Sequence, residues 1–144
     1  MKEFKLIVAG GRDFNNYELL RRALFAIADV ELADREVSIV SGMARGADAL
    51  GVRFARENNV KLHEFPADWD RHGKCAGFIR NHAMGDVADG LLAFWDGQSK
   101  GTNDMIQYMQ SKSKLVNIVN YYRKAHRCAL SFPFFNLFWS TYVN

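Results

Sequence analysis

The sequence predicts an α/β fold with a parallel sheet of about five strands and helices on both of its faces. Two observations support this prediction. Short apolar segments alternate with longer segments whose apolar residues recur at helical spacing. The segments between successive apolar runs are long enough for the crossover of roughly a dozen residues that parallel strands require. Such an arrangement is typical of Rossmann-like domains.

The first half of the chain is expected to contain three strands and two helices. Residues 4–9 are apolar and end at Gly10 and Gly11, as a buried strand does. Apolar residues recur at helical spacing from residue 16 to residue 29, and Asn15 or Asn16 can act as the N-cap. The other elements follow by the same criteria and are a strand, a helix and a strand over residues 36–41, 47–58 and 60–65.

The second half continues the same alternation. Residues 67–74 are polar, with one tryptophan and one glycine, and are expected to form a loop. The elements that follow are a helix, a strand, a turn, a helix and a strand over residues 76–88, 90–95, 96–101, 102–111 and 114–119. Right-handed crossovers place all strand-to-helix loops of a parallel sheet at one edge, so these loops are expected to meet there.

The chain changes in character after residue 120. It becomes rich in aromatic residues, with few charges after Arg127. We therefore divide the chain into a Rossmann-like domain over residues 1–120 and an aromatic C-terminal extension over residues 121–144. The extension can dock on the domain's own core, self-associate or contact a membrane. Because a dense exposed aromatic patch is a liability for a monomer, we expect a homo-oligomer, a dimer or larger.

The charge balance and the cysteines argue against several classes of protein. The net charge of +3 at pH 7 is small, whereas nucleic acid binding usually needs a clustered basic face, so nucleic acid is not expected as a partner. Cys75 and Cys128 match no metal-binding spacing, and we expect reduced thiols, no metal and no cofactor. The N-terminus shows no secretory leader, and no apolar run approaches the roughly 20 residues of a membrane helix. We therefore expect a cytoplasmic protein without a membrane partner.

Three strand-to-helix loops carry residues suited to a phosphate group. Their glycines let backbone N–H groups approach an anion, and a helix N-terminus favours negative charge. The alternative interpretations are ordinary tight turns, with Asp48 as a helix cap and Arg45 in a surface salt bridge. Neither GxxxxGK[ST] nor GxGxxG is present. The expected ligand-binding residues of these loops are Gly10, Gly11, Arg12, Asp13 and Phe14, then Ser41, Gly42, Arg45, Gly46 and Asp48, and finally Asp96, Gly97, Ser99, Gly101 and Thr102.

Three further residues between these loops are expected to contribute to the same site. Trp69 lies in the polar loop and, like Phe14, can pack against a base or a ribose; its alternative role is ordinary packing. Arg80 and Asn81 lie in the helix that follows, and Arg80 can pair with a phosphate. The sequence therefore predicts one ligand site at the carboxyl edge of the sheet.

Five segments of the chain also carry a resemblance to a known family. They are GGRDF at 10–14, SGMARGAD at 41–48, PADW at 66–69, AGFIRNHAM at 76–84 and AFWDGQSKGT at 93–102. In this order they resemble the signature blocks of the YspA, cpYpsA-related SLOG family, over residues 4–119. The resemblance implies a Rossmann-like fold related to the DprA and Lonely Guy (LOG) proteins. It also implies a bacterial or phage protein that senses or processes nucleotides, including NAD- or ADP-ribose-derived signals.

The LOG phosphoribohydrolases add a catalytic pattern, an arginine followed by a PGGxGTxxE loop. Arg80 matches the arginine, and Gly101 and Thr102 match the GT of the loop. Met105 stands at the glutamate position, and Asp104 lies one residue early. A thioether cannot take a proton or stabilise a cationic centre, so we expect a binding protein rather than an enzyme. The candidate catalytic residues, if there is a reaction, are Arg80, Asp96 and Asp104.

Together these features predict a protein that binds a nucleotide or a nucleotide-derived ligand, as a sensor or a sequestering protein. Three alternatives stay open. The first is hydrolysis of an N-glycosidic or phosphoribosyl bond, with Asp13, Asp96 or Asp104 as the carboxylate. The second is DprA-like binding of single-stranded DNA. The third is a structural role in which the aromatic extension drives assembly.

Overall fold

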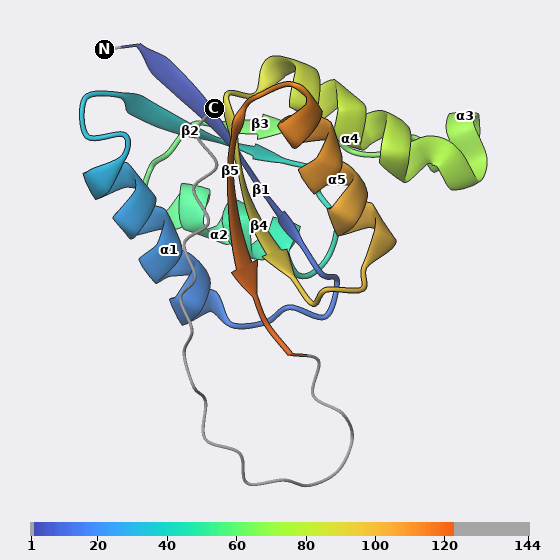
Figure 1. The fold of residues 1–144 in the computed structure, drawn as a ribbon, viewed down its shortest axis with the longest axis horizontal. Helices are drawn as coiled ribbons and strands as arrows, with labels where there is room; N and C mark the ends of the chain where they lie inside the picture. The colour runs from blue at the N-terminus through green and yellow to red at the C-terminus, as the bar shows by residue number, and fades with distance from the viewer. Residues whose placement is uncertain (1, 123–144) are drawn as a thin grey trace, which may run out of the picture.

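The computed structural model describes residues 2–122 and shows one parallel sheet between two layers of helices (Figure 1). The strand order is β3-β2-β1-β4-β5, and every neighbouring pair is parallel. The strands are β1 (Glu3–Gly10), β2 (Glu36–Ser41), β3 (Leu62–Glu64), β4 (Gly90–Trp95) and β5 (Leu115–Asn120). The predicted fold class is confirmed. The aromatic extension beyond residue 122 lies outside the described residues.

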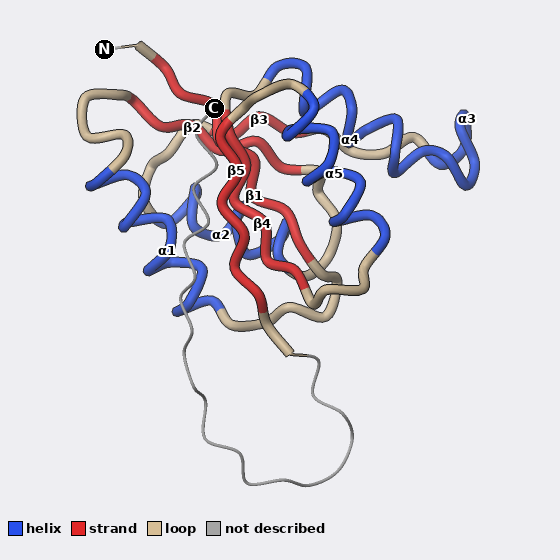
Figure 2. Tube along the Cα trace, viewed as in Figure 1, coloured by secondary structure: helices blue, strands red, loops and turns tan. Residues whose placement is uncertain are grey.

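The face of the sheet that each helix covers follows from the direction in which the chain crosses the sheet. The chain steps from β1 through β2 to β3, and then returns to the other side of β1. Reversing the direction of right-handed crossovers moves the helices to the opposite face, as Figure 2 shows. The helices are α1 (Tyr17–Val30), α2 (Ala47–Glu57), α3 (Trp69–His72), α4 (Ala76–Val87) and α5 (Lys100–Ser111), with a 3₁₀ turn η1 (Gly73–Cys75).

The central strand β1 is buried on both faces. Its side chains alternate, so Leu6 and Val8 pack in the core under α1 and α2, whereas Ile7 and Ala9 pack in the core under α4 and α5. Three of these side chains have no exposed surface in the structure, namely Leu6, Val8 and Ile7. In open α/β sheets whose faces are covered by helices, ligands bind at the carboxyl ends of the strands.

The structure corrects some of the predicted boundaries. Residues 67–74 were expected to form a loop, but they contain α3 and the start of η1. The reason is a capping contact, because the Asp68 side chain accepts a hydrogen bond from the Arg71 N–H at 3.1 Å. Strand β3 is also shorter than the expected 60–65, and α5 begins at Lys100 rather than Thr102.

The residues just after β5 belong to the packed domain. Tyr121 packs edge-on against Phe14, with ring centroids 5.0 Å apart. Its hydroxyl donates a hydrogen bond to Asp13 at 2.6 Å. Within residues 2–122, no helix has the length and apolar character needed to cross a membrane.

Candidate functional site

An open cavity of about 410 Å³ lies where four segments of the chain converge. Arg12 follows β1, the segment from Gly42 to Arg45 follows β2, and the segment from Pro66 to Trp69 follows β3. Arg80 reaches the cavity from α4. The cavity therefore lies at the carboxyl edge of the sheet, over the half formed by β1, β2 and β3.

The three arginines of the cavity come from segments far apart in the sequence. Arg12 and Arg45 are exposed, whereas Arg80 is partly buried. Burial lowers the pKa of Arg80, the nearby Asp48 opposes this shift, and Arg12 adds to it. Guanidinium groups gathered in this way suit an anion with several oxygens, because each presents a planar set of N–H donors.

Two contacts hold the Arg80 side chain in place. Its Nη1 donates a hydrogen bond to the carbonyl oxygen of Gly42, and its Nε donates to Oδ1 of Asn81 at 3.1 Å. A β-carbon at residue 42 would lie only 2.6 Å from Arg80 Nη1. Glycine is therefore needed at position 42 for the guanidinium to take this position.

Asp48 lies beside Gly42, in the first turn of α2. Its side chain is 5% exposed, and its Oδ2 accepts a hydrogen bond from the Ala44 N–H at 3.3 Å. Burial raises the pKa of Asp48 to about 6, and the positive charges of Arg80 and Arg12 oppose this shift. The carboxylate therefore compensates part of the positive charge of the cavity.

The loops after β1 and β2 touch through their backbones. The Ala47 N–H donates a hydrogen bond to the Gly11 oxygen at 3.2 Å. Gly46 has a φ of 81°, and a β-carbon there would overlap the backbone of Gly11 and Arg12. Gly46 thus permits the close approach that brings Arg12 and Arg45 to one cavity.

The loop after β4 was expected to bind phosphate, but none of its residues is among the described residues that line this cavity. Its polar groups form hydrogen bonds within the loop instead. Oδ1 of Asp96 accepts hydrogen bonds from the N–H groups of Gln98 and Ser99 at 2.9 and 2.8 Å. The Thr102 hydroxyl donates to Ser99 Oγ at 3.2 Å. The aspartate therefore occupies the N–H groups that were expected to hold an anion, and Gly97 and Gly101 are exposed beside them.

Several other expected ligand residues turn out to pack within the protein. Phe14 is 4% exposed and stacks on Phe94 with centroids 4.5 Å apart, so its ring is not available to a ligand. Asp13 accepts the hydrogen bond from Tyr121 described above. Ser41 Oγ accepts a hydrogen bond from the Met43 N–H at 3.1 Å. The polar side chains of the loops after β1 and β2, other than the arginines, thus stabilise the turns.

The sequence interpretation missed an apolar wall of the cavity. It consists of Met43, Ala44, Pro66 and Ala67, next to the half-exposed indole of Trp69. The signal for it was present, because residues 66–69 directly follow a strand and so belong at the same edge as the other loops. Of that segment, only Trp69 was predicted to be a ligand-binding residue.

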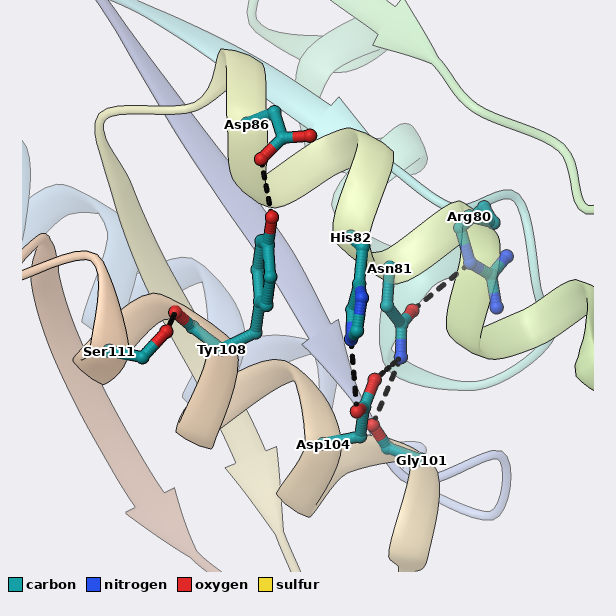
Figure 3. Close-up of polar contacts among 8 residues, drawn as sticks. All are labelled: Arg80, Asn81, His82, Asp86, Gly101, Asp104, Tyr108 and Ser111. Carbon is teal, nitrogen blue, oxygen red and sulfur yellow. Dashed lines mark hydrogen bonds and ion pairs between the residues drawn. The ribbon is translucent and has the colours of Figure 1, made fainter.

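The remaining candidates lie between α4 and α5. Asn81 is buried and bonded to Arg80, and its amide nitrogen donates to Asp104 Oδ2 at 3.2 Å (Figure 3). Asp104 Oδ1 also lies 3.2 Å from Nε2 of His82. Met105 is 1% exposed and packs in the core under α4 and α5. Asp104 is therefore linked to Arg80 through Asn81, whereas Met105 packs in the core.

Comparisons with known proteins give a family and a fold. A family model described as the YspA, cpYpsA-related SLOG family matches residues 4–72. Gene 61 protein of Mycobacterium phage D29 is 38% identical over 89 residues, which cover 58% of this chain and 70% of that protein. DNA processing protein A from Helicobacter pylori, described for its single-stranded DNA binding mode, matches with a TM-score of 0.54 and 17% identity, over 84% of this chain and 67% of that chain. This structural match shows the fold alone.

The expectation that nucleic acid is not a partner is wrong. It rested on the net charge of +3 for the whole chain. A protein that shares this fold has a single-stranded DNA binding mode. Net charge is a poor guide here because it does not report local clusters, and three arginines line one cavity of this domain.

Proposed function

Because the chain belongs to the YspA, cpYpsA-related SLOG family, we propose that it binds a phosphate-bearing nucleotide or nucleotide-derived ligand in the cavity described above. The family and the fold support nucleotide-related binding in general. One observation carries the finer assignment. Arg12, Arg45 and Arg80 share the cavity with the half-exposed indole of Trp69.

The lining of the cavity contains groups that suit both the phosphate and the base of a nucleotide. Phosphate oxygens accept hydrogen bonds from guanidinium groups, often two at a time. The indole of Trp69 and the apolar surface of Met43 and Pro66 offer a face on which a base can stack. The cavity volume of about 410 Å³ lies within the range of roughly 300–1,000 Å³ that is usual for small-molecule sites.

The chemistry of the cavity favours binding over hydrolysis. Among the described residues, no carboxylate lines the cavity. Asp48 is buried beside Gly42, Asp96 bonds its own loop, and Asp104 contacts Asn81 and His82. The role that follows is that of a sensor or a sequestering protein.

Calorimetric titration with AMP, ADP-ribose and NAD tests this proposal. A variant carrying Arg45→Ala and Arg80→Ala is expected to lose roughly 100-fold or more in affinity, because hydrogen bonds to charged groups contribute roughly 1.5–3 kcal/mol each. The control carries Lys100→Ala and Lys112→Ala, two exposed residues that do not line the cavity. It removes the same charge and is expected to bind within about twofold of wild type.

Equal affinity of the arginine variant and wild type for all three probes would rule the proposed site out. The same titrated samples, separated by chromatography, distinguish binding from hydrolysis. A hydrolase would release the free base or ribose phosphate, whereas the proposal expects each probe to be recovered intact.

Single-stranded DNA binding is a second candidate, favoured by the exposed indole of Trp69, which lines the cavity with the arginines. Trp69 is 51% exposed and Phe78, on α4, is 44% exposed. Aromatic rings beside positive charges form a sequence-tolerant platform for unpaired bases. Fluorescence anisotropy with an oligo-dT probe at several salt concentrations tests it. If the protein binds DNA, the logarithm of its affinity should fall linearly with the logarithm of the salt concentration. No change in anisotropy on adding protein would exclude DNA binding.

A further inference from the structure

We infer that Asn81 is the positioning residue for Arg80 and that it joins the arginine to the first turn of α5. The inference rests on the proposed function, because it concerns the same site. It adds a residue that does not line the cavity and acts only through its neighbour.

The contacts of Asn81 fully engage its amide. The side chain is 7% exposed. Its Oδ1 accepts a hydrogen bond from Arg80 Nε at 3.1 Å. Its Nδ2 donates to the Gly101 oxygen at 3.1 Å and to Asp104 Oδ2 at 3.2 Å, as Figure 3 shows. One side chain thus joins an arginine of α4 to two residues of α5.

These partners permit a single orientation of the amide. An amide has one oxygen that accepts and one nitrogen that carries two hydrogens. If it were reversed, the nitrogen would face the Arg80 N–H and the oxygen would face two other oxygens. Aspartate cannot replace it, because a carboxylate has no hydrogen to offer Gly101 and would repel Asp104. Asparagine is therefore required by the donor and acceptor pattern of the site.

As a consequence, the guanidinium plane of Arg80 is fixed before a ligand binds. The guanidinium is flat, and it is held at Nε by Asn81 and at Nη1 by Gly42. Three of its five N–H groups, including both on Nη2, are not used by these two contacts. Because ordering a long side chain opposes binding, an arginine that is already ordered binds an anion more tightly than a free one.

Asp104 anchors the Asn81 amide to α5. Oδ2 of Asp104 accepts from Asn81, while Oδ1 contacts His82 Nε2 at 3.2 Å. The carboxylate thus contacts two consecutive residues of α4, and of these two it is Asn81 that also bonds Arg80. Displacing α5 would therefore break the contacts that orient Asn81. The position of α5 thus affects the orientation of Arg80, although the cavity lies over the other half of the sheet.

The test is a double-mutant cycle in the full-length protein with AMP as the probe. Asn81→Ala is expected to weaken AMP binding by roughly 10-fold, the scale of the ordering cost of one long side chain. In an Arg80→Ala background the same change is expected to have no further effect, because Asn81 acts through Arg80. Adenosine, which has no phosphate, is expected to bind both single variants nearly as it binds wild type.

His82→Ala is the matched control. This residue is the next one on α4 and contacts the same carboxylate, but no contact joins it to Arg80. It is expected to lower stability slightly and to leave AMP affinity within about twofold of wild type. NMR hydrogen exchange at Arg80 Nε–H adds a measurement that needs no ligand, and exchange should accelerate in Asn81→Ala and not in His82→Ala.

Two results would overturn the inference while leaving the proposed function intact. One is an equal loss of AMP affinity from Asn81→Ala with and without Arg80. The other is unchanged Nε–H exchange in Asn81→Ala. If wild type binds none of AMP, ADP-ribose and NAD, the proposed function fails first, and the inference falls with it.

Discussion

The loops after β2 and β4 are similar in sequence and different in structure. Each follows a buried strand, contains glycines and an aspartate, and leads into a helix, over residues 41–48 and 96–102. In the β4 loop, the Asp96 carboxylate accepts two N–H groups of its own loop. In the β2 loop, the buried Asp48 accepts one N–H, that of Ala44, and Arg80 from α4 donates a hydrogen bond to the Gly42 oxygen.

The comparison teaches what makes a loop able to hold an anion. Glycine and a helix N-terminus supply N–H groups, but a nearby carboxylate can take them first. The deciding feature is whether cations from other segments reach the loop. Of the two loops, the β2 loop has them, since Arg12 from the loop after β1 and Arg80 from α4 line its cavity beside its own Arg45.

Gly42→Ala is expected to give the largest effect. A β-carbon there would lie 2.6 Å from Arg80 Nη1 and 2.8 Å from Asp48 Oδ2, so the guanidinium must move. AMP affinity should fall roughly 100-fold, as for the loss of one or two charge-assisted hydrogen bonds, and stability by roughly 1–3 kcal/mol. Calorimetry and urea unfolding measure both. Retention of wild-type affinity would show that Arg80 can bind from another position.

Asp48→Asn is expected to stabilise the protein at pH 8. The pKa of Asp48 is raised from 3.8 to about 6, and each unit corresponds to about 1.4 kcal/mol, so the buried charge costs about 3 kcal/mol. Asparagine removes this cost and keeps an oxygen for the Ala44 N–H. Because the folded form takes up its proton below pH 6 and the unfolded form only near pH 3.8, the gain should shrink between these values.

Unfolding curves at pH 8 and pH 4 measure this difference between variant and wild type. Asp34→Asn is the control, because Asp34 is exposed and its replacement should change stability by less than about 0.5 kcal/mol at either pH. A gain for Asp48→Asn that is the same at both pH values would mean that the carboxylate's charge is not the cause. A protein that keeps a costly charge beside its arginines is consistent with selection for the site over stability.

Most of the fold could be predicted from the sequence because it depends on local periodicity. The strands at residues 36–41 and 90–95 were predicted with their observed bounds, and most of the residues in each strand are buried. The short helix α3 was missed because four residues show no periodicity. Its only signal was Asp68 as an N-cap three residues before Arg71.

For the site, the sequence could predict which loops meet at one edge of the sheet, but not the contacts of their side chains. The rule that parallel strands end at one edge brought Arg12, Arg45 and Trp69 together in advance. It could not say that Phe14 turns inward onto Phe94, or that Asp96 bonds its own loop. Those outcomes depend on which partner each side chain meets after folding.

Asp96→Ala is expected to have a moderate effect on stability and none on binding. It removes the acceptor of the Gln98 and Ser99 N–H groups in the turn before α5, and each such hydrogen bond contributes roughly 0.5–1.5 kcal/mol. AMP affinity at a temperature where the variant is folded should stay within about twofold of wild type, since removing a surface charge has little effect at a distance. A tenfold loss would place the β4 loop in the ligand site.

Gly101→Ala is expected to give the smallest effect and separates the two loops most directly. A β-carbon there would meet nothing within 4 Å, and the residue lies in the first turn of α5. Alanine is the better helix former, so stability should rise by roughly 0.5–1 kcal/mol. The open space is informative, because a phosphate bound by this loop would fill it and alanine would then reduce AMP affinity. Unchanged affinity would mean that this glycine, unlike Gly42, is not needed for ligand approach.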